Sequence, residues 1–158
     1  MNTGADDLAI QTQPRWHRTV LLAAAVHSLA WGAFIIALPE LSAKVYGFGR
    51  PVTELSLWQG TGLFIVLLCV GYAIASTDSV QHWAVVLIGL LAKILGPVGL
   101  FWSVITSQLP PTVLYLAPLN DVLWWFPFAL ILKHSWNAIR MTRSPNSRNI
   151  HRSPDSAG

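Results

Sequence analysis

Two charged residues, Lys93 and Asp121, lie deep inside apolar stretches of this sequence. Lys93 is part of VVLIGLLAKILGPVGLFW, and Asp121 is part of YLAPLNDVLWWFPFALIL. A charge at the centre of a bilayer costs about 2.5–3.5 kcal/mol even on the mildest insertion scale, so such residues usually have a partner and often a function. The chemistry open to them is ion pairing, proton transfer, or hydrogen bonding to a ligand.

The segments that carry these charges are long enough to cross a membrane. Hydrophobic residues make up 53% of the 158 residues and charged residues only 11%, against about 25% in soluble domains. A membrane-spanning helix needs about 20 mainly apolar residues. Four segments qualify: Thr19–Pro39, Leu55–Ser76, His82–Ile105 and Thr112–Leu132. We therefore expect one all-α domain over residues 16–136, an integral membrane antiparallel four-helix bundle.

The distribution of Lys and Arg predicts how this bundle lies in the membrane. With four spans, both termini share a side, and that side carries Arg15, Arg18, Lys133, Arg140, Arg143, Arg148 and Arg152. The opposite side carries Lys44 and Arg50. This asymmetry predicts cytoplasmic N- and C-termini in a bacterial inner membrane. It also explains the net charge of +3 without nucleic-acid binding. Residues 1–15 and 137–158 are polar and predicted to be disordered tails.

Several polar groups are expected at a common depth in the bundle. Counting from the span midpoints places His27, Lys93 and Asp121 near the membrane midplane, with Asn120 beside Asp121. The third and fourth spans are tightly connected neighbours, so Lys93 and Asp121 can meet directly. Gln59 lies about two turns outward. The sequence therefore predicts a polar site that opens to the non-cytoplasmic side or sideways to lipid.

Prolines close to these charges predict open backbone acceptors. A proline inside a helix leaves the carbonyl four residues before it without its usual partner. Pro97 frees the carbonyl of Lys93, and Pro118 and Pro127 free two further carbonyls in the fourth span. Unpaired backbone in a membrane persists only where protein, water or a ligand satisfies it. This arrangement is typical of a binding site.

Each of these residues also has a purely structural interpretation. Lys93 and Asp121 can form an ion pair whose only role is to fix the helix register. His27 can be a packed, hydrogen-bonded histidine, and Gln59 can bond between helices. The longer connection, Glu40–Glu54, either lies at the membrane interface or folds back over the bundle.

Disulfide, thiol-redox and metal chemistry have little support in the sequence. The one cysteine, Cys69, lies inside an apolar run, so an intramolecular disulfide and a CxxC pair are excluded. His82 and His134 lie at span ends on the cytoplasmic side and could meet there, but two exposed histidines are a weak metal site. We therefore predict no metal ligands.

Two stretches resemble a known family. Gly89–Pro97 reads Gly-Leu-x-x-Lys-x-x-Gly-Pro, and Asn120–Phe128 reads Asn-Asp-x-x-Trp-Trp-x-Pro-Phe. Over Leu55–Leu132 the chain resembles small DoxX-like four-helix bacterial membrane proteins. Some proteins of that kind are subunits of quinone-linked sulfur oxidation, so the resemblance implies a quinone or a redox protein as a partner.

Three functions remain open at the level of sequence. The first is binding of a quinone or another lipid-soluble molecule within a redox system, with Lys93, Asp121, Asn120 and His27 at its polar end. The pocket would be lined by Trp31, Trp58, Trp124 and Trp125. The second is a non-catalytic accessory membrane subunit, and the third is a component of an oligomeric transporter. The sequence does not decide whether the protein is an enzyme.

Overall fold

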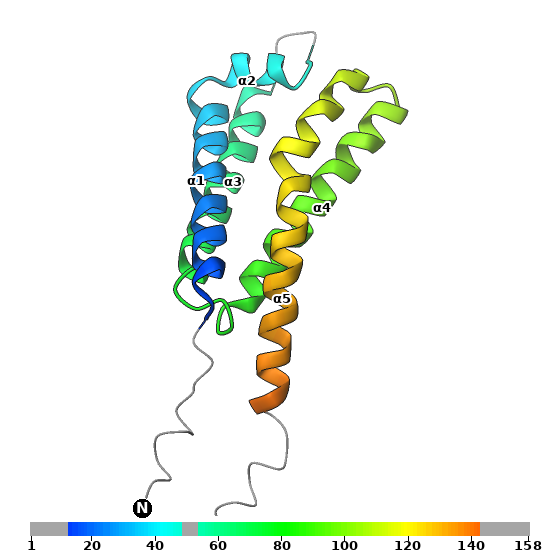
Figure 1. Ribbon diagram of the computed structural model, residues 1–158. Coiled ribbons are helices and arrows are strands. Elements are labelled where there is room, and N and C mark those ends of the chain that lie inside the picture. Colours follow the sequence, from blue (N-terminus) through cyan, green and yellow to red (C-terminus); the bar gives the residue numbers. More distant parts are fainter. Residues whose placement is uncertain (1–12, 49–53, 143–158) are drawn as a thin grey trace, which may run out of the picture.

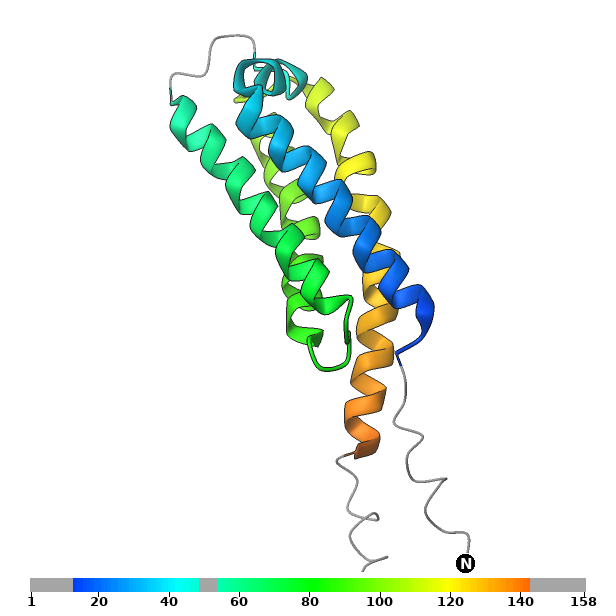
Figure 2. The ribbon, with the colours of Figure 1, turned by 90° about the vertical axis from the view of Figure 1, so that its left-hand side faces the viewer.

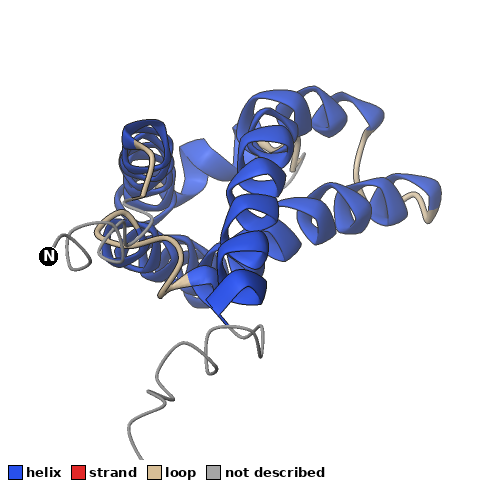
Figure 3. Cartoon of the chain, turned by 60° about the horizontal axis from the view of Figure 1, so that its bottom comes forward, coloured by secondary structure: helices blue, strands red, loops and turns tan. Residues whose placement is uncertain are grey.

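The computed structural model describes residues 13–48 and 54–142, and these residues form helices and loops without any strand (Figure 3). The helices in chain order are α1 (Arg15–Ala37), α2 (Pro39–Val45), α3 (Leu55–Ala75), α4 (Trp83–Ile105), the 3₁₀ helix η1 (Pro111–Tyr115), the π-helix η2 (Pro118–Val122) and α5 (Leu123–Thr142). The all-α prediction is confirmed for this part of the chain.

Four helical segments are long and apolar enough to cross a membrane. Three of them are α1, α3 and α4, whose bounds agree closely with the predicted spans. The fourth runs from Pro111 to Met141 and combines η1, η2 and α5. Since α5 continues to Thr142, the chain is still helical where the sequence predicts a tail from residue 137. The rest of both predicted tails lies outside the described residues, apart from the short lead into α1.

Prolines and a glycine mark the helix boundaries. Pro39 occupies the first turn of α2, where its missing N–H costs nothing. The residue before a proline avoids the helical region, and Leu38 accordingly has φ −129° and ψ 60°. These two residues end α1 at Ala37. Gly47 has φ +79°, which suits glycine, and it ends the short helix α2.

The sequence predicts the fourth segment as one membrane-spanning helix, but in the structure it is not a continuous α-helix. Its first turn, η1, is a 3₁₀ helix, and the turn η2 is a π-helix that begins at Pro118. In η2 the N–H of Leu123 bonds to the carbonyl of Pro118, five residues earlier. Proline cannot donate to the preceding turn, and π turns of this kind often lie at functional sites. The wide turn contains Asn120 and Asp121.

The long helices pack as two pairs. α1 lies against α3, and α4 lies against η2 and α5; Figures 1 and 2 show both pairs, with α2 covering one end of the first. The first pair is in backbone contact, because a Cβ at Gly32 would lie 2.7 Å from the carbonyl oxygen of Gly62. Small residues at such crossings are typical of membrane helices.

The main apolar core joins the two pairs near the end that carries the chain termini (Figure 1). Its largest fully buried members are Leu21, Tyr72, Val86, Phe128 and Ile131. They come from the beginning of α1 and α4, the end of α3 and the middle of α5. The opposite half of the molecule lacks an equivalent core among the described residues and is where the candidate site lies.

The outer surfaces of the helices are apolar. α3 exposes Leu57, Leu63, Phe64 and Leu67, each by more than half of its surface. A helix that is hydrophobic on all sides is expected in a membrane or a large core. The outward leucines are therefore what a lipid-facing surface requires.

The connection after α1 folds back over the bundle. The Trp31 indole donates a 2.6 Å hydrogen bond to the Tyr46 hydroxyl, and the Trp58 indole donates a 2.9 Å bond to Ser42 Oγ. The ring of Phe48 packs edge-on against Trp58. Of the two alternatives for this connection, its described part therefore takes the second.

Candidate functional site

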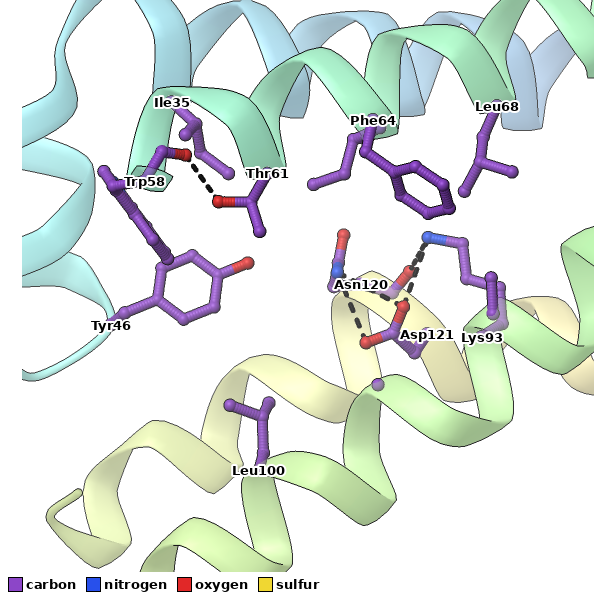
Figure 4. Close-up of a pocket in the computed structure, with 13 residues that line it drawn as sticks. Ile35, Tyr46, Trp58, Thr61, Phe64, Leu68, Lys93, Leu100, Asn120 and Asp121 are labelled. Atoms are coloured by element: carbon purple, nitrogen blue, oxygen red, sulfur yellow. Dashed lines mark hydrogen bonds and ion pairs between the residues drawn. The ribbon is translucent and has the colours of Figure 1, made fainter. Parts of the chain in front are cut away.

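A cavity of about 250 Å³ lies between the two helix pairs, on the α2 side of the core. Figure 4 shows α3 along one wall, α4 and η2 along the facing wall, and the segment after α2 at one end. Most of the lining is apolar. The lining residues are Ile35, Tyr46, Trp58, Thr61, Phe64, Ile65, Leu68, Ala92, Lys93, Gly96, Leu100, Asn120 and Asp121.

The two charges found in the sequence form an ion pair in the cavity wall. Lys93 Nζ lies 3.2 Å from Asp121 Oδ1, and the two residues are only 5% and 7% exposed. The ammonium also donates a 2.8 Å hydrogen bond to the backbone carbonyl of Asn120. A buried charge is tolerated only when it is paired and hydrogen-bonded. Both conditions hold for this pair.

Asn120 connects the ion pair to the open part of the cavity. Its Nδ2 donates to both carboxylate oxygens of Asp121, at 3.2 and 3.3 Å. Its side-chain oxygen points away from Asp121 into the cavity in Figure 4 and has no partner among the described residues. An ammonium has three donors, and Lys93 uses two. The wall therefore offers one spare donor and one spare acceptor to a ligand.

One of the backbone acceptors freed by proline is already occupied. Pro97 lies inside α4, which frees the carbonyl of Lys93. The Trp125 indole donates a 2.9 Å hydrogen bond to that carbonyl. Of the three partners expected for this oxygen, protein, water or a ligand, the structure shows a protein group. Trp125 instead ties α5 to α4 directly behind the ion pair.

Tyr46 supplies a further polar group that sequence reasoning missed. Its ring lines the cavity at the α2 end, opposite Asn120 (Figure 4). Because its oxygen accepts the proton of Trp31, its own hydroxyl proton remains free to donate. Burial raises the pKa of Tyr46, and the Asp121 charge acts in the same direction. The hydroxyl is therefore a neutral donor at physiological pH. Its only sequence signal is an aromatic residue in the connection after α1.

The remaining predicted site residues lie outside the cavity lining. The Trp124 indole donates a 3.3 Å hydrogen bond to His27 Nδ1. Since an indole nitrogen only donates, this bond makes His27 neutral with its proton on Nε2. The Gln59 amide donates to the carbonyl of Ile36 at 2.9 Å. His27 and Gln59 thus have the hydrogen bonds that their structural interpretations require.

The four tryptophans predicted to line the pocket also differ in whether they reach the cavity. Trp58 lines the cavity, as predicted. Trp124 belongs to the apolar core, and Trp31 reaches the cavity only through Tyr46. Trp125 lies behind the ion pair, so three of the four indoles stabilise the frame of the site without lining it.

Comparisons with known proteins leave this geometry as the main guide to function. Models of known protein families, curated proteins and solved structures all give no match for the chain.

Proposed function

We propose that this protein is a multi-pass membrane protein whose antiparallel four-helix bundle binds a small lipid-soluble molecule in the cavity between its helix pairs. The best candidate is the ring of a quinone, which would make the protein part of a redox system. The observation that carries the proposal is an apolar cavity whose wall and α2 end carry polar groups with hydrogen-bonding capacity to spare.

The size and polarity of the cavity favour a single ring. Cavities for drug-sized ligands have about 300–1,000 Å³, and this one has about 250 Å³. A quinone ring has two carbonyl acceptors on opposite edges. The spare N–H of Lys93 is a donor in the α4 wall, and the hydroxyl of Tyr46 is a donor at the α2 end of the cavity. In the reduced ring the oxygens carry protons, and the side-chain oxygen of Asn120 can accept one of them.

The charge distribution supports the proposed placement in a bacterial inner membrane. Both described ends of the chain lie at one end of the molecule (Figure 1), where α1 begins and α5 ends. Arg15 and Arg18 are on the first turn of α1, and Lys133 and Arg140 are in the second half of α5. Lys44 is at the other end, in α2. This asymmetry favours cytoplasmic termini.

The resemblance to DoxX-like proteins points to the same ligand. It remains a prediction based on the Gly89–Pro97 and Asn120–Phe128 stretches. Both stretches contribute to the cavity wall, through Lys93 and Gly96 from the first and through Asn120 and Asp121 from the second.

Quinone titration followed by tryptophan fluorescence tests the proposal, because Trp58 lines the cavity. We expect saturable quenching with a short-chain quinone. Gly96→Leu places a side chain in the cavity, where a Cβ would lie 3.5 Å from Asp121 Oδ2. This variant should abolish the quenching. Gly99→Leu is the matched control, since nothing lies within 4 Å of a Cβ there. Absence of saturable quenching in helical wild-type protein would refute the proposal.

A second candidate function is a structural or accessory subunit without a ligand. It is favoured by the satisfied hydrogen bonds of the Lys93–Asp121 pair. Exchanging the two residues, Lys93→Asp with Asp121→Lys, distinguishes the two functions. The accessory function requires only that the exchanged protein folds and assembles normally. If the exchanged protein folds but loses a quenching response that the wild type shows, the purely structural role is excluded.

A further inference from the structure

Two histidines meet at the end of the bundle that carries the termini, far along α1 and α5 from the cavity. His17, in the first turn of α1, is fully buried. Its ring centre lies 4.9 Å from that of His134 in α5, with the rings nearly perpendicular. The sequence allows a contact of His134 with His82; in the structure the ring of His134 contacts that of His17.

Hydrogen bonds to the loop between α3 and α4 fix the orientation of the His17 ring. His17 Nδ1 lies 2.8 Å from Ser79 Oγ. Ser79 is itself held in place, because the Ser135 hydroxyl donates to its carbonyl at 3.1 Å. The Gln13 amide donates to the neighbouring carbonyl of Ser76 at 3.0 Å. With Nδ1 engaged, the Nε2 atom of His17 is left for another partner.

The Nε2 atoms of both histidines are buried without a hydrogen-bond partner among the described residues. A buried polar atom left unsatisfied costs about 1–3 kcal/mol. Two such atoms on rings that touch indicate a ligand that both nitrogens share.

The spacing of the rings limits what that ligand can be. Two imidazoles bound at about 2.0 Å to one tetrahedral metal ion have ring centres about 5 Å apart. Two imidazoles sharing one water at about 2.9 Å from each nitrogen have ring centres more than about 6 Å apart. The observed 4.9 Å agrees with two rings that share one metal ion and is too short for a shared water. It is also a normal separation for two rings in edge-to-face contact.

We propose that His17 and His134 bind a divalent transition-metal ion, such as Zn²⁺ or Cu²⁺, through their Nε2 atoms. Neutral imidazole is a preferred ligand of both ions. Ser79 holds His17 in the ligating tautomer, as outer-shell partners of metal-bound histidines do. No group of three or more His, Cys, Asp or Glu side chains in residues 13–48 and 54–142 is arranged for a metal. Ligands other than these side chains would have to complete the coordination.

The test uses the full chain purified in detergent without a polyhistidine tag and depleted with a chelator. We expect one Cu²⁺ per chain with electron paramagnetic resonance coupling to two imidazole nitrogens. Zn²⁺ should compete for the same site. This measurement needs no variant. Wild-type protein that binds neither ion saturably would overturn the proposal.

Variants then locate the site. His17→Asn keeps a polar group facing Ser79 but removes Nε2, and His134→Phe keeps the ring contact. Loss of an outer-shell partner weakens metal binding by roughly 10–100-fold, and we expect Ser79→Ala to have an effect of this size. Each histidine variant should weaken binding by more than that. His82→Ala is the control, because His82 is bonded to the Asp78 carbonyl and should bind normally. Unchanged affinity in both His17→Asn and His134→Phe would assign the metal to surface histidines instead.

Discussion

Replacing Lys93 with Met and Asp121 with Leu, singly and together, measures whether the two charges act as one unit. Lys93→Met leaves a carboxylate buried with only the Asn120 amide as partner. Asp121→Leu leaves a buried ammonium bonded only to the Asn120 carbonyl. In the double variant no charge remains, and apolar side chains of similar size replace both charged ones in the cavity wall.

The magnitudes follow from the burial of the pair. Removing one partner of a buried ion pair costs about 3–5 kcal/mol, whereas replacing both with apolar residues is often neutral. The double variant still leaves the Asn120 carbonyl without its 2.8 Å donor, which costs about 1–3 kcal/mol. Each single variant should therefore lose about 3–5 kcal/mol of unfolding free energy. The double variant should lose less than either, with a coupling energy of about 3 kcal/mol or more.

The assay is reversible unfolding in mixed micelles, followed by helical circular dichroism for all four proteins. Losses that simply add, with coupling below about 0.5 kcal/mol, would refute the conclusion that these charges stabilise each other. Gly99→Leu serves again as the control for a new side chain on α4, because nothing lies near that position.

Three further predictions concern the frame of the site. Gly32→Ala should lower the unfolding free energy by about 1–3 kcal/mol, because the new methyl group overpacks against α3. Gly60→Ala, with open space around it, should not lower it, and the same unfolding assay compares the two variants. Trp125→Phe should cost about 1–3 kcal/mol by leaving the Lys93 carbonyl unpaired. Burial raises the pKa of Tyr46, so the neutral hydroxyl should contribute its full stabilisation below about pH 10 and lose it as the pH rises further. The unfolding free energies of wild type and Tyr46→Phe, compared at alkaline pH, test this.

Much of this architecture is predictable from sequence because membrane helices obey a length rule. Four apolar runs predict the four long helical segments. Counting residues from the midpoint of each run predicts that Lys93 and Asp121 lie at the same depth. The interruption of the fourth segment is harder to predict. A proline at 118 shows that a turn is disturbed, yet it does not say whether a 3₁₀, π or kinked helix results.

Contacts that depend on helix rotation were not accessible from sequence. Trp125 and Trp124 are adjacent, but one bonds to Lys93 and the other to His27. Tyr46 reaches the cavity because α2 folds the chain back, which composition does not reveal. His17 and His134 are predictable as residues at the same end, but their contact requires knowing which faces of α1 and α5 meet.

The central claim is that the cavity holds a lipid-soluble ring, and the molecule that co-purifies with the protein tests it most directly. Wild type, Gly96→Leu and Gly99→Leu would be purified in parallel from native membranes, extracted with organic solvent and assayed by mass spectrometry. We predict about one quinone per chain in wild type and Gly99→Leu, since a cavity of this size holds one ring. Gly96→Leu should retain much less. No such molecule in wild type, or equal amounts in all three proteins, would contradict the account.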